Sequence, residues 1–135
     1  MRVFLDTNVL VSAVATRGVC ADVLTVVLAE HELVVGEVVL AELSRILSSK
    51  MKLPPHIVEE ADAFLRQEGT VTSAQSNADL SVIRDEDDRK VMAEAIAGGA
   101  EVLVTGDRDL LDVASQLELE VVSPRGFWEK LHGRQ

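Results

Sequence analysis

The sequence of 135 residues predicts an α/β fold in which a central parallel sheet of about five strands is flanked by helices on both faces. Two observations indicate this class. Short apolar runs alternate with segments whose apolar residues recur every three or four positions, as in repeated strand-helix units. The best of these runs, EVLVT at residues 101–105, is nearly continuous in apolar residues, as strands buried in a parallel sheet are. The length and the 47% hydrophobic content suit one domain spanning residues 1–135.

The strand candidates are the short apolar runs bounded by polar or turn residues. The run at residues 69–73 is the weakest and is expected at an edge of the sheet, and residues 74–84 after it carry no strong pattern. The predicted strands are residues 2–5, 33–36, 69–73, 101–105 and 120–122.

The helix candidates have recognisable ends. Pro54 and Pro55 open one helix because proline is tolerated in a first helical turn. The segment at residues 85–97 begins with four acids and stops at Gly98 and Gly99, which is the polarity that the helix dipole and glycine C-caps favour. The predicted helices are residues 7–18, 21–30, 38–50, 54–68, 85–97, 109–117 and 124–132.

Charge and cysteine content exclude several classes of protein. With 23 Asp and Glu against 13 Lys and Arg, the formal charge of -10 argues against nucleic-acid binding through a generally basic surface. The single cysteine, Cys20, has no partner for an internal disulfide, and the three histidines lack metal-ligand spacing. No apolar run approaches the roughly 20 residues of a membrane span, and the N-terminus lacks a signal-peptide pattern. We therefore expect a cytoplasmic protein without a membrane segment.

Four acids stand where the predicted sheet would gather them, because functional groups in such folds collect at the carboxyl ends of the strands. Asp6 directly follows the first strand, and Asp107 follows the fourth. Glu42 lies just over one turn into the helix after the second strand. Asp88 lies in the first turn of the helix that precedes the fourth strand, and it reaches this edge only if that helix starts there.

Each of these acids also has a simpler explanation when taken singly. Asp6 is then an N-cap and Asp107 a turn residue. Asp88 interacts with the helix dipole three residues after Asp85, and Glu42 is a solvated surface charge. We interpret the neighbouring acids as caps or solvated charges: Asp85, Glu86, Asp87, Asp109 and Asp112.

Taken together, the four acids predict a metal site. Two like charges 4 Å apart repel by about 4 kcal/mol at an effective dielectric near 20, so gathering carboxylates in one crevice is costly without a cation. Oxygen ligands without histidine or cysteine suit hard ions, so Mg²⁺ or Mn²⁺ is expected. Such an ion activates water for phosphodiester hydrolysis without a side-chain nucleophile.

The sequence resembles the PIN domain family along essentially its whole length, and in outline it is similar to the VapC-type toxins of type II toxin-antitoxin pairs. The first matching segment holds Asp6, the second holds Glu42, the third holds Asp88 and Asp107, and the fourth is the final strand and helix. In order, these segments are VFLDTNVLVSA, VVLAELSRIL, RDEDDRKVMAEAIAGGAEVLVTGDRDLL and VVSPRGFWEKL.

The resemblance implies a three-layer PIN fold and an endoribonuclease that uses Mg²⁺ or Mn²⁺ on single-stranded RNA. It implies that the metal is held by Asp6, Glu42 and Asp88, with Asp107 supporting that ion or a second one. Asn8 and Thr105 would orient these carboxylates by hydrogen bonds. It also implies a homodimer and a small antitoxin partner whose tail fills the active-site groove. The resemblance thus implies catalytic and metal-binding roles for Asp6, Glu42, Asp88 and Asp107, and orienting roles for Asn8 and Thr105.

RNA phosphates need basic partners, and Arg89, Lys90 and Arg108 are the nearest candidates to the four acids, with solvated surface charge as the alternative explanation. Because aromatic residues are only 3% of the chain, stacking of bases on an aromatic platform is not expected.

Other functions make different demands on the sequence. A response-regulator receiver needs a lysine after its last strand, where this chain has Ser123, Pro124 and Arg125. A haloacid-dehalogenase-like phosphatase needs a second aspartate two residues after the first, where this chain has Asn8. Two alternatives stay open: a catalytically silent PIN-like interaction module, which binds metal without turnover, and an RNA-processing nuclease outside a toxin pair.

Overall fold

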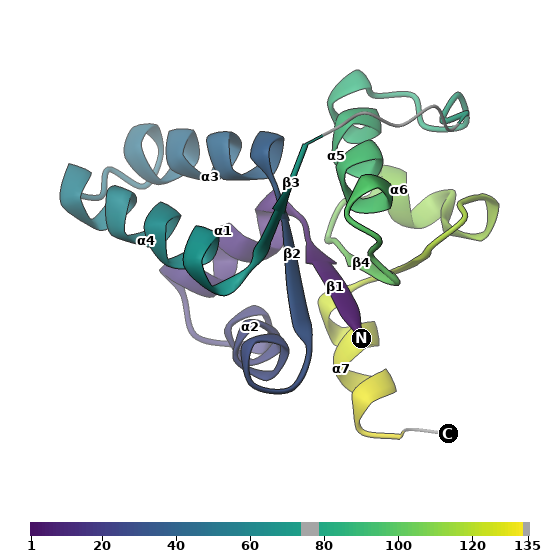
Figure 1. Ribbon diagram of the computed structural model, residues 1–135, viewed down its shortest axis with the longest axis horizontal. Coiled ribbons are helices and arrows are strands. Elements are labelled where there is room, and N and C mark those ends of the chain that lie inside the picture. The colour runs from purple at the N-terminus through teal and green to yellow at the C-terminus, as the bar shows by residue number, and fades with distance from the viewer. Residues whose placement is uncertain (74–78, 134–135) are drawn as a thin grey trace.

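The computed structural model describes residues 1–73 and 79–133. Its centre is a sheet of five parallel strands in the order β3-β2-β1-β4-β5, so β1 lies in the middle and β3 and β5 form the edges (Figure 1). The strands are β1 (Arg2–Leu5), β2 (Glu32–Gly36), β3 (Thr70–Thr72), β4 (Val102–Val104) and β5 (Glu120–Val122).

Helices lie to both sides of this sheet, which gives the three-layer α/β architecture predicted from the sequence (Figure 1). In the described residues they are α1 (Thr7–Ala15), α2 (Val19–Glu30), α3 (Glu37–Ser49), α4 (Pro55–Glu68), α5 (Glu86–Ala97), α6 (Arg108–Asp112) and α7 (Pro124–Leu131), with a 3₁₀ turn at Ala114–Gln116.

The predicted elements and the observed ones agree in order, and the predicted edge strand is confirmed as β3. The prediction of one helix over residues 109–117 is wrong. The helix α6 ends at Asp112, where the N–H of Val113 turns back to the carbonyls of Leu110 and Leu111, and the chain continues as a separate 3₁₀ turn. Of the segment without a pattern, residues 74–78 lie outside the described residues, as do residues 134–135 at the end of the predicted domain.

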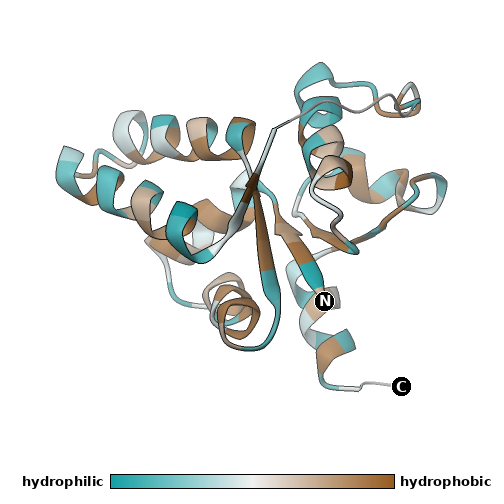
Figure 2. Cartoon of the chain, viewed as in Figure 1, coloured by the Kyte–Doolittle hydropathy of each residue, from teal (hydrophilic) through white to brown (hydrophobic). Residues whose placement is uncertain are grey.

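The core forms around the central strands, because their apolar residues are covered on both faces. Every described residue of β4 and the last three residues of β1 are buried, and Figure 2 shows these strands in the hydrophobic colour. The helix α3 adds Leu40, Leu43 and Leu47 from one face at helical spacing. In the described part of the chain, no single helix is long and apolar enough to cross a membrane, although α1 and α2 pass that test as a pair bent by 102°.

Helices begin at the carboxyl end of the sheet, and this edge is where the acids of interest lie. Asp6 caps α1 directly after β1, and Asp107 caps α6 after β4. Gly36 ends β2 and starts α3 without any side-chain cap. The register pairs Leu5 with Val104, so the next residue of each chain segment also lies side by side at this edge.

Candidate metal and active site

A cleft of about 320 Å³ opens at the carboxyl edge of the central strands. Its walls come from the start of α1, one face of α3, the first turns of α5 and the cap of α6. The lining residues are Asp6, Thr7, Asn8, Val38, Glu42, Ile46, Asp87, Asp88, Val91 and Asp107. The four acids singled out from the sequence therefore line one cleft.

Asp6 is the most deeply placed of these acids, with only 5% of its surface exposed. Its Oδ1 accepts a hydrogen bond of 2.7 Å from the backbone N–H of Thr7, so it is the N-cap of α1 as well as a lining group. Burial raises the pKa of Asp6 above its usual value of 3.8, and hydrogen bonds from Thr105 and Thr7 oppose that rise. The nearby charge of Asp107 adds to it.

Thr105 and Asn8 connect the two strand ends. The hydroxyl of Thr105, which is fully buried, donates to Oδ2 of Asp6 at 2.7 Å and accepts the backbone N–H of Asp107 at 3.0 Å. The amide of Asn8 donates to the same Oδ2 at 3.3 Å, and its oxygen accepts the N–H of Gly106 at 2.8 Å. These bonds fix the orientation of the Asp6 carboxylate.

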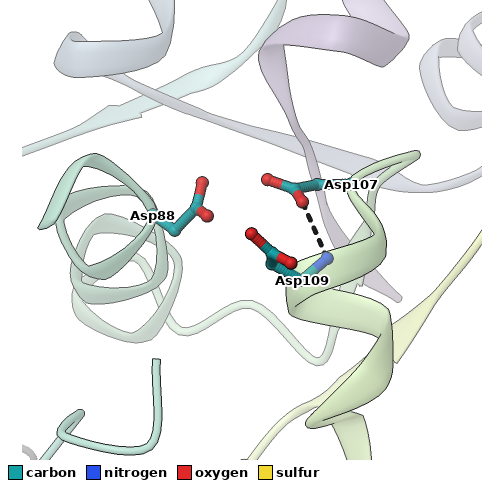
Figure 3. A group of neighbouring side chains, drawn as sticks. All are labelled: Asp88, Asp107 and Asp109. Carbon is teal, nitrogen blue, oxygen red and sulfur yellow. Dashed lines mark hydrogen bonds between the residues drawn. The ribbon is translucent and has the colours of Figure 1, made fainter. Parts of the chain in front are cut away.

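Three carboxylates converge beside Asp6, from α5 on one side and the start of α6 on the other (Figure 3). One oxygen each of Asp88, Asp107 and Asp109 lies within 4.8 Å of the other two. Asp107 also accepts the N–H of Asp109 at 2.9 Å, as the cap of α6. The interpretation of Asp109 as a plain cap or solvated charge is incomplete, because the structure brings its carboxylate into this group.

Asp88 carries the largest shift among these acids, with its pKa raised from 3.8 to about 7. Burial is the main cause, followed by the negative charge of Asp107 and a hydrogen bond shared with it, with Asp85 and Asp6 adding to the effect. The helix α5 starts at the carboxyl edge of the sheet, which is the condition that the sequence set for Asp88. Asp85 caps that helix by accepting the N–H groups of Asp87 and Asp88.

Glu42 also lines the cleft, but its side chain is exposed and paired with a cation, unlike those of Asp6 and Asp88. Its side chain is 42% exposed, and its two carboxylate oxygens accept bonds of 2.6 Å and 3.1 Å from the guanidinium of Arg45, one helical turn further along α3. The hydrogen bonds from Arg45 hold the pKa of Glu42 below its usual value. Glu42 is outside the group of three converging carboxylates.

A model of the PIN domain matches residues 2–109. The chain belongs to the PIN domain family. Among solved structures, this PIN domain is similar to the crystal structure of VapBC2 from Rickettsia felis bound to a DNA fragment from their promoter, with 21% identity and a TM-score of 0.66. The likeness covers 91% of this chain and 98% of that chain, and a comparison with curated proteins gives no match.

The basic residues proposed from the sequence lie near the acids but outside the lining of the cleft. The guanidinium of Arg89 donates to the carbonyls of Ile83 and Arg84, at 2.6 Å and 3.3 Å. Lys90 is exposed, 4.0 Å from Glu86. Both line a separate hollow on the outer face of α5, whereas Arg108 is exposed at the first residue of α6.

The donor set of the PIN domain fits a hard divalent cation. Every polar group that the lining acids offer is an oxygen, and neither histidine nor cysteine is among the lining residues. Burial and neighbouring negative charge raise the pKa values of Asp6 and Asp88, so their ionised forms are costly in this cleft without a counter-charge. A divalent cation offsets charge of this kind without further protein groups.

Proposed function

We propose that this PIN domain is a Mg²⁺- or Mn²⁺-dependent endoribonuclease for single-stranded RNA and the toxin of a type II toxin-antitoxin pair. The observation that carries the proposal is the cleft that gathers Asp6, Glu42, Asp88 and Asp107 while the pKa values of Asp6 and Asp88 are raised. When bound there, a divalent cation supplies an acidified water and offsets the charge that develops on a phosphate during hydrolysis.

The side chains have separate roles in this proposal. Asp6, Asp88, Asp107 and Glu42 hold the cation, and the first of these is kept in one orientation by the bonds from Thr105 and Asn8. Such preorganisation lowers the cost of reaction because the carboxylate does not reorient during the chemical step. Asp88 has to lose its proton to act as a ligand, and a bound cation favours that loss.

We propose that RNA binds through a few basic residues near the cleft. Arg108, adjacent in sequence to Asp107, is proposed to contact a phosphate beside the cleft, and Arg89 and Lys90 are proposed to contact phosphates that extend over the outer face of α5. The net charge of -10 opposes wide nonspecific binding, so cleavage is expected to depend more on the cation than on a basic surface. High salt should then weaken substrate binding with the shallow slope of a few phosphate contacts.

The partnership with an antitoxin rests on the fold likeness to VapBC2 and on the charge of the cleft. An acidic cleft attracts a basic peptide segment, so the proposed antitoxin has a basic tail that covers the acids. We further propose a homodimer located in the cytoplasm, where RNA substrates are available. These points are tested by copurification with the product of an adjacent short gene and by the mass of the purified protein in solution.

The activity is tested with a labelled single-stranded RNA, purified protein and added Mn²⁺ or Mg²⁺. Cleavage is expected with either metal and should stop on addition of EDTA. Asp6→Asn should lower the rate by more than the roughly 10- to 100-fold typical of groups that only orient ligands, while its circular dichroism spectrum stays unchanged. Equal activity of the wild type and Asp6→Asn, or no cleavage by either with metal present, would overturn the enzymatic proposal.

A single-stranded DNA of the same sequence and a double-stranded RNA serve as matched substrates. The proposal expects both to be cut more slowly than the single-stranded RNA. Binding of Mn²⁺ without cleavage of any of the three nucleic acids would instead support the catalytically silent interaction module.

A further inference from the structure

The start of α3 lacks the usual local cap. Gly36 occupies the N-cap position and has no side chain to accept the first N–H groups of the helix. Those groups are satisfied from another element, by Glu94 of α5. Its two oxygens accept the N–H of Val38 at 2.9 Å and 3.2 Å, and the neighbouring N–H groups of Val39 and Glu37 help to lower its pKa.

Glu94 is a buried carboxylate, with 1% of its surface exposed. A buried charge is costly unless it is paired or hydrogen-bonded. Burial raises the pKa of Glu94 above its usual value, and the N–H groups at the positive end of the α3 dipole oppose that rise. The site is also shaped for this side chain. A Cβ on Gly36 would lie 1.9 Å from Oε1 of Glu94 and 2.6 Å from its Cδ, so any other residue at position 36 would displace the Glu94 carboxylate from this place.

The hydrogen bonds that Glu94 accepts from Val38 join α5 and α3, the two helices that carry Asp88 and Glu42 of the cleft. Val38, which Glu94 holds, lies four residues before Glu42 on α3, and both line the cleft. On α5, Glu94 lies one turn after Val91 and two turns after Asp88, which line the opposite wall. A local serine cap at residue 36 would satisfy the same N–H groups without making this connection.

We propose that Glu94 is a positioning residue of the metal cleft, which ties the start of α3 to α5 and thereby sets the separation of Glu42 and Asp88. The inference rests on the proposed metal-dependent function of the cleft. It assigns Glu94 no contact with metal or RNA. Its effect is on how well the two helices present their carboxylates to one cation.

The test separates capping of α3 from the connection between the helices. Glu94→Ala removes both. The double variant Gly36→Ser with Glu94→Ala restores a local cap, because, of the three atoms nearest to the new Cβ, it removes Oε1 and Cδ of Glu94 and keeps only the Glu94 Cβ, at 3.1 Å. Gly36→Ser alone is the matched control and should destabilise the protein, since the serine Cβ collides with Glu94. Thermal unfolding, Mn²⁺ affinity by calorimetry, and kcat and KM for RNA are measured for each protein.

Glu94→Ala is expected to lower the unfolding temperature and to weaken Mn²⁺ binding by about 10- to 100-fold, the range for groups that orient metal ligands. The double variant should recover most of the unfolding temperature while Mn²⁺ affinity and kcat stay low and KM for RNA is unchanged. Recovery of Mn²⁺ affinity together with stability would overturn the inference and leave Glu94 a plain cap.

Three further outcomes distinguish a failure of the inference from a failure of the proposed function. If Glu94→Ala does not fold, Glu94→Gln takes its place, since its one carbonyl oxygen keeps part of the capping and its amide N–H₂ opposes the rest. Wild-type Mn²⁺ affinity in that variant would then count against the inference. If the wild type binds Mn²⁺ but cleaves no RNA, the proposed activity fails and the Mn²⁺ affinities alone decide the role of Glu94. A wild type that binds no Mn²⁺ would overturn both.

Discussion

Two walls of the cleft present their carboxylates in opposite ways. The strand-end wall holds Asp6 directly after β1, and the helical wall holds Glu42 on α3. Asp6 is buried and is fixed by three hydrogen-bond donors from its own surroundings: Thr7, Asn8 and Thr105. Glu42 is exposed and paired with one flexible cation, Arg45. The sheet therefore builds its part of the site in advance, whereas α3 supplies an acid that can exchange its partner at little cost, because exposed ion pairs contribute only about 0–1 kcal/mol.

The largest effect is expected from removing a hydrogen bond that fixes Asp6 in the strand-end wall. Thr105→Val removes the hydroxyl that orients Asp6 and receives the N–H of Asp107. We expect Mn²⁺ affinity and RNA cleavage to fall by about 10- to 100-fold, and the free energy of unfolding to fall by about 1–3 kcal/mol because buried polar groups lose a partner. Calorimetry and chemical denaturation measure the two effects.

Thr105→Ser is the matched control, because it keeps the hydroxyl and deletes one methyl group. Its Mn²⁺ affinity should stay near that of the wild type. If the valine and serine variants bind Mn²⁺ equally well, the hydroxyl does not preorganise Asp6, and the contrast between the two walls loses its basis.

The second prediction concerns the pH dependence of stability, which follows from the raised pKa values of Asp88 and Asp6. The pKa of Asp88 is about 7 in the folded protein and 3.8 without the fold, so the native state binds more protons between these values. The stability of the metal-free protein should therefore be highest below pH 4 as far as this group is concerned, and should fall as the pH rises towards 7. The raised pKa of Asp6 acts in the same direction.

Thermal unfolding at pH 5, 6, 7 and 8, with EDTA and with Mg²⁺, measures this dependence. The increase in unfolding temperature on adding Mg²⁺ should grow with pH, because the cation replaces the protons. Asp88→Asn should flatten the metal-free dependence. A Mg²⁺ effect that is the same at all four pH values would argue against a cation among these acids.

The smallest effect is expected on the helical wall. Arg45→Gln frees Glu42 from its ion pair, so Mn²⁺ should bind more tightly by up to about fivefold, the equivalent of one exposed ion pair. The unfolding temperature should change little. Arg45→Lys keeps a positive charge at the same helical position and is the matched control. A loss of Mn²⁺ affinity in Arg45→Gln would mean that Arg45 places Glu42 for the metal and does not compete for it.

The strand-end acids were predictable because each stands just after a short apolar run, and the alternation of strands and helices indicates a parallel sheet whose carboxyl ends share one edge. An apolar run followed directly by Asp6, and another followed by Thr105 and Asp107, are sufficient once the strands are parallel neighbours. The prediction that Asp88 lies at this edge required one further condition, that α5 starts at the carboxyl edge of the sheet. The cap at Asp85 meets it, and that cap is itself visible in the sequence.

The details that escaped prediction depend on side-chain direction or on distant residues. Asp109 follows Asp107 by two residues, a spacing typical of a helix cap, and only the fold shows that its carboxylate turns towards Asp88. The pairing of Glu42 with Arg45 has a signal in the spacing of three residues along a helix. The contact of Gly36 with Glu94 has no signal in the local sequence, because 58 positions separate the two residues.

The hydrogen bond between Thr105 and Asp6 joins residues 99 positions apart and lies at the floor of the cleft. During synthesis at about 5–20 residues per second, Asp6 leaves the ribosome roughly 5–20 s before Asp107 follows it. Through that interval the growing chain carries its first acid but lacks the strand that orients it. An incomplete chain therefore cannot assemble this site, which forms only after β4 has been synthesised and paired with β1.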